Sequence, residues 1–250
     1  MEKDIEWLLN EKYKGEKTEG FFADCKRLES DEPLAYVIGS MPFLNTTIFL
    51  DSNPLIPRTE TEYWVEKAIQ EIKNLNSQTV RILDLCAGSG CIGVAILKNI
   101  TNAKVDFAEI DESHHKTILK NIKENEINLD RTEIFGGDLF ERINDSYDYI
   151  LSNPPYIDPE IDRTTKSVRD HEPEVALYGG NLGLELVERI INKSGKHLEE
   201  AGILYIEHEP EHQNKIQTLA TNNSMKAVSY ADQFDVIRYT RMRRTGPKDV

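Results

Sequence analysis

One short segment of the sequence combines residue types that suit chemistry at an amide nitrogen. Residues 152–156 read Ser-Asn-Pro-Pro-Tyr and follow the apolar run Tyr147–Leu151, which predicts a buried strand. A residue before proline is held in extended geometry, so Asn153 sits on a stiff backbone. Its side chain offers an oxygen acceptor, Pro154 offers a free carbonyl, and Tyr156 offers a flat apolar face with a polar tip.

This set suits a planar –NH₂ group bonded to an sp² carbon. The carbonyls of Asn153 and Pro154 can each accept one N–H, which polarises the nitrogen, aims its lone pair and stabilises the positive charge that grows during attack. No carboxylate base is required, because the proton can leave afterwards. Pro155 stiffens the same turn. The competing interpretation is a rigid turn that ends a strand and has no chemical role.

Three other predicted strand ends carry residues that suit a cofactor. Asp84 lies near the end of the first strand, and the small residues after it let a backbone approach a ligand beside a helix N-terminus. Glu109 ends the next strand, where an acid suits ribose hydroxyls. After the third strand, Asp138 suits an exocyclic amine and Leu139 suits the face of an adenine. The loop residues are Cys86, Ala87, Gly88, Ser89 and Gly90.

Each of these features alone leaves its interpretation open. The glycine loop is compatible with NAD, a flavin, S-adenosylmethionine or a plain strand-to-helix turn, and Glu109 and Asp138 are also compatible with a solvated surface acid and a turn aspartate. All four strand ends are expected at one edge, because ligands of open α/β sheets bind beyond the carboxyl ends of the strands. Beside a site for an amide nitrogen, the expected electrophile is the methyl sulfonium of S-adenosylmethionine.

Strands and helices alternate from residue 80 onward and supply the scaffold for these residues. The pattern predicts an α/β, Rossmann-like fold with a seven-stranded, mostly parallel sheet and helices on both faces. Before it, residues 1–32 are predicted to be helical, and Phe43–Leu50 to form a hairpin. Thr59 and Glu62 match a capping box at the start of a helix.

The composition of the chain argues against several classes of partner and location. The net charge of −14 over 250 residues repels phosphate backbones, so we expect no direct nucleic-acid partner. No apolar run approaches ~18 residues and the acidic N-terminus does not resemble a signal peptide, so we expect a cytoplasmic protein without a membrane partner. We expect no metal: the three cysteines form no framework, and Pro210 interrupts the zinc-like pattern His208-Glu-Pro-Glu-His212.

At these residues the sequence resembles amino-methylating class I S-adenosylmethionine-dependent methyltransferases. Two groups share Asn-Pro-Pro-Tyr: adenine-N6 DNA methyltransferases and the HemK/PrmC family, which methylates the glutamine of the Gly-Gly-Gln motif in peptide chain release factors. The segments "LIPRTETEYWVE" (Leu55–Glu66) and "HEPEVALYGGNLGLEL" (His171–Leu186) are similar to HemK/PrmC blocks. Their order and spacing favour that family over residues 33–241.

The resemblance implies a class I methyltransferase fold, S-adenosylmethionine as cofactor and a release factor as partner. It divides the chain into a short helical and hairpin segment, residues 1–56, and a methyltransferase domain, residues 57–250, and we expect a monomer. The cofactor would contact the strand-end residues named above together with Asn153. Residues 153–156 would hold the glutamine, and Arg58 and Glu172 would shape its pocket.

Four departures from the family pattern accompany the resemblance, and one is that "EHEPEHQ" (Glu207–Gln213) matches the family's late Glu-Xaa-Gly…Gln segment only loosely. Cys86-Ala87 stands where the family usually has Gly-Thr, and Glu109 stands where an aspartate is usual. The segment before Pro33 is shorter than the family's N-terminal helical domain, so we expect docking of the release factor to be reduced or rebuilt. The alternatives are a DNA adenine methyltransferase, which the acidic charge opposes, and a non-catalytic binding module, which the intact motifs oppose.

Overall fold

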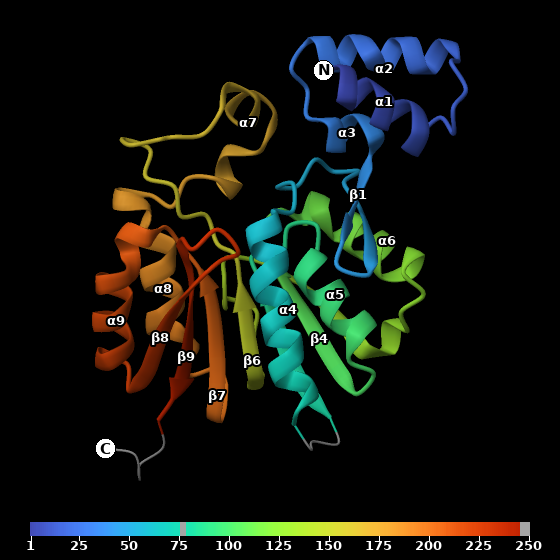
Figure 1. Cartoon of the computed structure of the whole chain (residues 1–250). Helices are drawn as coiled ribbons and strands as arrows, with labels where there is room; N and C mark the ends of the chain where they lie inside the picture. Colours follow the sequence, from blue (N-terminus) through green and yellow to red (C-terminus); the bar gives the residue numbers. More distant parts are fainter. Residues whose placement is uncertain (76–78, 246–250) are drawn as a thin grey trace.

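A computed structural model describes residues 1–75 and 79–245 (Figure 1). Within these ranges seven strands form one sheet in the order β5-β4-β3-β6-β7-β9-β8. Neighbours from β5 to β7 are parallel, and β9 is antiparallel to both β7 and β8. The predicted α/β fold with a mostly parallel sheet is therefore confirmed. The strands are β3 (Val80–Leu85), β4 (Ala103–Glu109), β5 (Thr132–Gly136), β6 (Tyr147–Ser152), β7 (Leu198–Glu207), β8 (Met225–Ala231) and β9 (Ile237–Arg244).

Helices cover both faces of this sheet because its strands alternate apolar residues between two core clusters. In β3, Ile82 belongs to the cluster under α4, α5 and α6, whereas Leu83 and Leu85 belong to the cluster under α8 and α9. Strands buried on both faces read as continuous apolar runs, as the sequence had predicted. The helices are α4 (Thr59–Lys73), α5 (Cys91–Asn99), α6 (His115–Glu124), α8 (Glu185–Ser194) and α9 (Gln213–Asn222).

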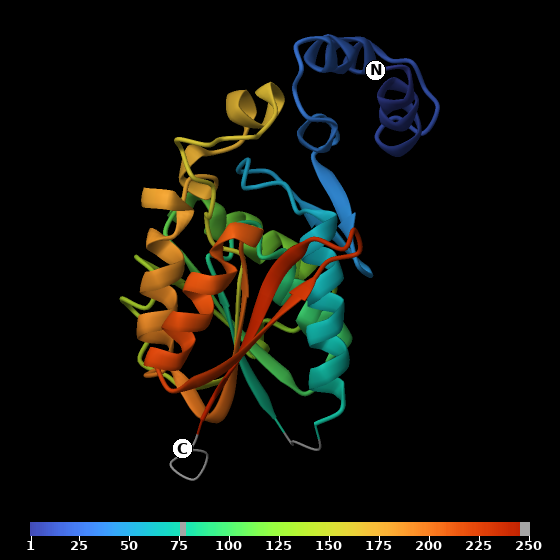
Figure 2. The ribbon, with the colours of Figure 1, turned by 60° about the vertical axis from the view of Figure 1, so that its left-hand side comes forward.

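The N-terminal helices form a small unit with its own core beyond the carboxyl ends of the strands (Figures 1 and 2). Leu8, Phe21, Leu28 and Val37 make up this core. The helices are α1 (Glu2–Glu11), α2 (Glu19–Glu29) and α3 (Leu34–Ile38). No helix within residues 1–75 and 79–245 is long and apolar enough to cross a membrane.

The predicted hairpin consists of β1 (Ser40–Phe43) and β2 (Thr46–Phe49), and it packs against α5 and α6. The Asn121 side chain exchanges two hydrogen bonds with the Phe49 backbone, and Asn125 does the same with Thr47. The apolar side chains of the hairpin join the core under α4. The division of the chain at residue 56 stays a prediction, and its end at 246–250 lies outside the described residues.

The capping box predicted at the start of α4 is wrong. Thr59 is the first residue of α4, and its hydroxyl donates to Glu60 at 3.1 Å. Glu62 accepts instead from the backbone N–H of Leu44 in the hairpin turn. A tertiary contact therefore takes the carboxylate that a capping box would have used.

A long segment between β6 and α8 folds over the same edge of the sheet. It contains α7 (Lys166–His171), which lies beyond the carboxyl ends of the strands, as the N-terminal helices do (Figures 1 and 2). The Ser167 hydroxyl donates to the Asp31 carbonyl at 2.7 Å and joins α7 to the turn after α2. The short 3-10 helices are η1 (Glu112–His114), η2 (Leu129–Arg131), η3 (Glu174–Ala176), η4 (Asn181–Gly183) and η5 (Pro210–His212).

Candidate active site

Two neighbouring cavities open at the carboxyl edge of the sheet. Six predicted cofactor residues line the first, which we call the Glu109 cavity: Cys86, Gly88, Glu109, Asp138, Leu139 and Asn153. Arg58, Pro154, Tyr156 and Glu207 line the second, which we call the Arg58 cavity, together with Asn153. Asn153 therefore stands where the two cavities meet. Pro155, predicted on the substrate side, lines the Glu109 cavity instead.

Glu109 is held by backbone N–H groups rather than by a cation. Its Oε2 accepts from Gly88 at 2.7 Å, its Oε1 accepts from Asp111 at 2.9 Å, and the side chain is almost fully buried. Each carboxylate oxygen has a second lone pair, so two ligand hydroxyls can still donate to it. Gly88 has a φ of +54°, and a Cβ added there would meet nothing within 4 Å, so the loop presents open backbone to the cavity.

The electrostatics of the Glu109 cavity discriminate between candidate ligands. Its charged lining consists of Glu109 and Asp138, and no lysine or arginine is among the described residues that line it. A ligand that carries ribose hydroxyls and a positive charge fits these residues.

The buried carboxyl of Asp84 supports the glycine loop from behind. Its Oδ2 accepts from the Gly93 backbone at 2.8 Å, which ties the end of β3 to the first turns of α5. Its Oδ1 has no hydrogen-bond partner among the described residues. Burial raises the pKa of Asp84 to about 8, and the nearby charge of Glu109 adds to that shift. Asp84, Ala87, Ser89 and Gly90 are not among the residues that line the cavity.

Asp138 has a partner that the sequence did not indicate. Its Oδ2 pairs with the guanidinium of Arg189 on α8, so one oxygen is engaged before any ligand arrives. Leu139, next in the chain, is buried in the wall of the cavity. The pairing leaves the other Asp138 oxygen to accept from a ligand amine.

A hydrogen-bond relay fixes the orientation of the Asn153 amide. Asn153 Nδ2 donates to the Thr61 hydroxyl at 3.1 Å, and that hydroxyl donates to Glu207 Oε2 at 2.7 Å. Because a hydroxyl has a single hydrogen, which goes to the carboxylate, it must accept from the Asn153 NH₂ group. The carbonyl oxygen of the Asn153 side chain therefore remains free to accept from a ligand, and no described residue donates to it. The relay presents the acceptor that the sequence argument required.

Glu207 is the centre of this relay and ends β7 with no exposed surface. It accepts from Thr61 and from Trp64 Nε1 on one oxygen, and from the Tyr156 hydroxyl at 2.8 Å on the other. Burial raises the pKa of Glu207, whereas these three donors oppose the shift. Three donors need an ionised acceptor, so we assign Glu207 as a carboxylate that orients both Asn153 and Tyr156.

The glycines of the "YGGNLG" segment let the chain pack directly against residues 154–158. A Cβ at Gly183 would lie 2.0 Å from the Tyr156 carbonyl oxygen, and one at Gly179 would lie 2.7 Å from that of Pro155. Backbone hydrogen bonds join Ile157 to both Leu177 and Gly179. The close approach explains why glycine stands at these positions. No described residue donates to the Pro154 carbonyl, which stays available to a ligand.

Arg58 and Glu172 connect two segments above the Arg58 cavity. Glu172 is buried, and its Oε1 accepts from Arg58 at 2.6 Å while its Oε2 accepts from the Ile56 backbone at 3.0 Å. Arg58 lines the cavity, but Glu172 is not among its lining residues and acts by holding Arg58 in place. The pair holds the segment before α4 against the segment after α7.

Two residues of the site escaped the sequence prediction. Glu207 is the last residue of β7 and lies at the edge where ligands bind, so the strand-end rule could have found it. Thr61 lies in the first turn of α4, and no local pattern marks it as part of a relay. Both residues reach Asn153 only through tertiary structure.

Known methyltransferases match part of this chain in sequence and share its fold. A family model described as "Methyltransferase small domain" matches residues 69–170. The ribosomal protein L11 methylase of Lactobacillus delbrueckii subsp. bulgaricus shares the fold, with a TM-score of 0.58 at 15% identity over 78% of this chain and 83% of that chain. The family match thus places a methyltransferase domain over β3 to β6 and the Asn153 motif.

Sequence relatives give the family. The chain is 32% identical over 206 residues to the release factor glutamine methyltransferase of Lactococcus lactis subsp. lactis, which covers 81% of this chain and 74% of that protein. It is 31% identical over 177 residues to the ribosomal protein uL3 glutamine methyltransferase of Francisella tularensis subsp. tularensis, over 70% of this chain and 56% of that protein. The chain belongs to the release factor glutamine methyltransferase family, which confirms the HemK/PrmC resemblance.

Proposed function

We propose that the protein transfers a methyl group from S-adenosylmethionine to the side-chain amide nitrogen of the glutamine in the Gly-Gly-Gln motif of a peptide chain release factor. The observation that carries this proposal is the fixed orientation of Asn153, which presents a carbonyl at the junction of the two cavities. Membership in the family supports the same activity. We further propose that the enzyme acts as a monomer in the cytoplasm.

The Glu109 cavity is the proposed cofactor site. S-adenosylmethionine supplies an electrophilic methyl group on a positively charged sulfur. Glu109 would accept from the ribose hydroxyls, and Gly88 would let the backbone approach. Leu139 would cover the adenine, and the free oxygen of Asp138 would accept from its amine. The acidic lining without lysine or arginine suits a cationic cofactor.

The Arg58 cavity is the proposed glutamine site. The carbonyls of Asn153 and Pro154 would each accept one N–H of the glutamine amide, which places its nitrogen beside the Glu109 cavity. In that position they stabilise the positive charge that develops on nitrogen, and the proton leaves after attack. Tyr156, anchored to Glu207, provides the face against which the amide lies. Fixing the approach of the nitrogen contributes further to the rate.

Mass spectrometry of a release factor after incubation with the protein and S-adenosylmethionine tests this proposal. We expect one added methyl group on the glutamine of the Gly-Gly-Gln motif. A ribosomal protein uL3 and a DNA duplex serve as competing substrates in parallel reactions. Preferred methylation of uL3, or appreciable N6-methyladenine in DNA, would overturn the assignment, and failure to bind S-adenosylmethionine in calorimetry would favour a non-catalytic module.

A further inference from the structure

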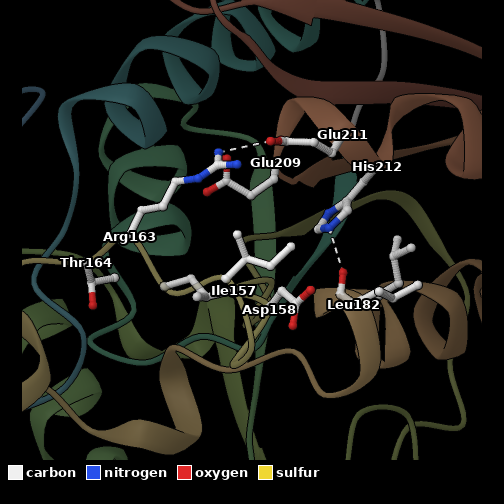
Figure 3. A pocket seen from close by; sticks show the side chains of 10 residues that line it. Ile157, Asp158, Arg163, Thr164, Leu182, Glu209, Glu211 and His212 are labelled. Atoms are coloured by element: carbon white, nitrogen blue, oxygen red, sulfur yellow. Dashed lines mark hydrogen bonds and ion pairs between the residues drawn. The ribbon is translucent and has the colours of Figure 1, made fainter.

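A third pocket lies beside the Arg58 cavity and is not explained by the proposed chemistry (Figure 3). It has a volume of about 360 Å³, and we call it the His212 pocket. This pocket and the Arg58 cavity are adjacent, because they share the lining residues Ile157, Arg163, Thr164 and Glu209. Ile157 directly follows Tyr156, and it places the pocket beside the proposed glutamine site.

His212 contributes a buried nitrogen without a partner. Its side chain is 5% exposed, and Nε2 lies 2.9 Å from the Leu182 carbonyl, to which it must donate because a carbonyl only accepts (Figure 3). Burial lowers the pKa of His212, while the Leu182 carbonyl and the carboxylates of Glu209, Glu211 and Asp158 oppose that shift. The ring is therefore neutral, and Nδ1 is an acceptor that no described residue satisfies.

The carboxylates of the pocket outnumber its cations. Glu211 pairs with Arg163 at 2.9 Å, and Glu209 pairs with Arg238 at 3.4 Å. Asp158 accepts from the backbone N–H of Glu160 at 2.9 Å but pairs with no cation among the described residues. Asp158 is thus unpaired and lies on the opposite side of Ile157 from Glu209 and Glu211 in the view of Figure 3, and Arg238 also pairs with Asp232 at 3.5 Å.

Large apolar side chains in the lining of the pocket are also exposed to solvent. Ile161 and Leu182 are each 57% exposed although they are large apolar side chains, and both line the pocket. The pocket therefore combines an exposed apolar wall with acceptors in need of a donor.

We propose that the His212 pocket binds the side chain of a lysine or arginine of the substrate protein, a few residues from the glutamine that is methylated. The aliphatic stem of such a side chain covers the apolar wall, and its charged head donates to Asp158 and to His212 Nδ1. Four residues of extended chain span about 13–14 Å, and the pocket shares lining residues with the Arg58 cavity, so we place the basic residue within four positions of the glutamine. This inference rests on the proposed function, because it assigns a second contact to the same substrate.

The first test of the proposal replaces basic residues of the substrate with a neutral residue. Each lysine or arginine within four positions of the methylated glutamine is changed to methionine, which keeps the stem and removes the charge. We expect one such change to raise KM about tenfold and leave kcat nearly unchanged, the order expected for one charged hydrogen bond. If an acidic substrate residue proves to be the one that matters, Arg163 is the recognition group and the proposal is wrong.

The second test of the proposal changes the enzyme, with the variant Asp158→Asn. An asparagine keeps the hydrogen bond to the Glu160 backbone, so the turn is preserved while the charge is lost. With the natural substrate, we expect Asp158→Asn to raise KM about as much as the substrate change does. With the neutralised substrate, the variant should raise KM no further, because the two changes remove the same contact. Glu160→Gln, two residues away and outside the lining, is the matched control and leaves KM unchanged.

The outcomes separate this inference from the proposed function. If the enzyme methylates the release factor but the two changes multiply their effects on KM, or neither has an effect, the His212 pocket does not bind the substrate side chain. If the enzyme does not methylate the release factor at all, the proposed function itself fails. In that case a panel of Gln-containing peptides with and without a basic neighbour, assayed for methyl transfer, still tests the pocket: equal KM values would overturn it.

Discussion

The Glu109 cavity and the Arg58 cavity meet at Asn153, yet they are built by different means. On the Glu109 side, a carboxylate holds a loop only 21 residues away in the chain, through a backbone N–H. On the Arg58 side, Asn153 depends on Thr61, which is 92 residues away, and Thr61 depends on Glu207, which is 146 residues away. The first side is short-range and uses backbone, whereas the second is a long-range chain of side chains.

This difference indicates a division of labour. A cofactor site whose loop is held by backbone N–H groups tolerates side-chain changes that keep the loop. A substrate site whose single amide is oriented through two other residues responds to changes at each of them. Substitutions on the two sides should therefore separate cleanly into effects on cofactor affinity and effects on kcat.

The largest effect is expected for Asn153→Ala. Removing the amide deletes an acceptor that stabilises the charge growing on nitrogen, so we expect kcat to fall by about 10²–10³-fold, as for one lost oxyanion-hole donor. Cofactor affinity, measured by calorimetry, should change little. Asn153→Asp is the companion variant, because its carboxylate cannot donate to Thr61. Retention of wild-type kcat in Asn153→Ala would refute the mechanism.

A smaller loss is expected when the relay is broken at Glu207. In Glu207→Gln the charge that strengthens the bonds from Thr61 and Tyr156 is lost, and the Tyr156 hydroxyl must turn to accept from the new NH₂ group. We expect kcat to fall by roughly 30-fold with unchanged cofactor affinity. Glu71→Gln makes the same chemical change at the far end of α4 and should leave kcat intact. A loss of cofactor affinity in Glu207→Gln would show that the two sides are not separate.

The relay also predicts a pH dependence. Burial raises the pKa of Glu207 above the ordinary 4.5, so on acidification it takes up a proton at a higher pH than a free glutamate does. The protonated acid cannot accept from all three donors, and kcat should decline on the acid side above pH 4.5. In Glu207→Gln this acid limb should be absent from the kcat profile. An identical acid limb in both proteins would assign it to another group.

On the other side of the comparison, Glu109→Gln should weaken cofactor binding. The amide replaces one of two oxygens that accept from Gly88 and Asp111, so an N–H faces an N–H and the loop shifts. We expect the Kd for S-adenosylmethionine to rise by about tenfold, while kcat at saturating cofactor stays close to that of the wild type. A kcat loss at saturation as large as that of Glu207→Gln would contradict the division of labour.

The contrast between short-range and long-range contacts also explains how much of the fold and the site could be predicted from the sequence. The sheet, the residues at its strand ends and the Asn153 motif follow local sequence patterns, so they could be predicted. The role of Thr61 was not, because a threonine in the first turn of a helix is ordinary until the fold brings it to Asn153. The engagement of Asp138 by Arg189 and of Glu62 by the hairpin turn likewise depends on which helix face meets which loop. Local periodicity carries no such information.

The last prediction concerns stability rather than activity and compares the two buried acids at the same edge, Asp84 and Glu207. Glu207 has three donors, whereas Asp84 has one donor and a free oxygen, and its pKa is raised from 3.8 to about 8. The folded state therefore keeps a proton that the unfolded state loses above pH 3.8, so this contribution to stability is complete below that pH and is lost as the pH rises toward 8.

Asp84→Asn, which stays neutral, should remove this decline. Between about pH 5 and pH 8 we expect the unfolding free energy of the cofactor-free wild type to fall relative to that of the variant by up to about 1.4 kcal/mol per pH unit, measured by urea denaturation. Asp130→Asn, at an exposed position, is the control and should leave the pH dependence unchanged. Parallel stability curves for wild type and Asp84→Asn would mean that Asp84 is ionised in the folded protein, and then both acids at this edge would be charged.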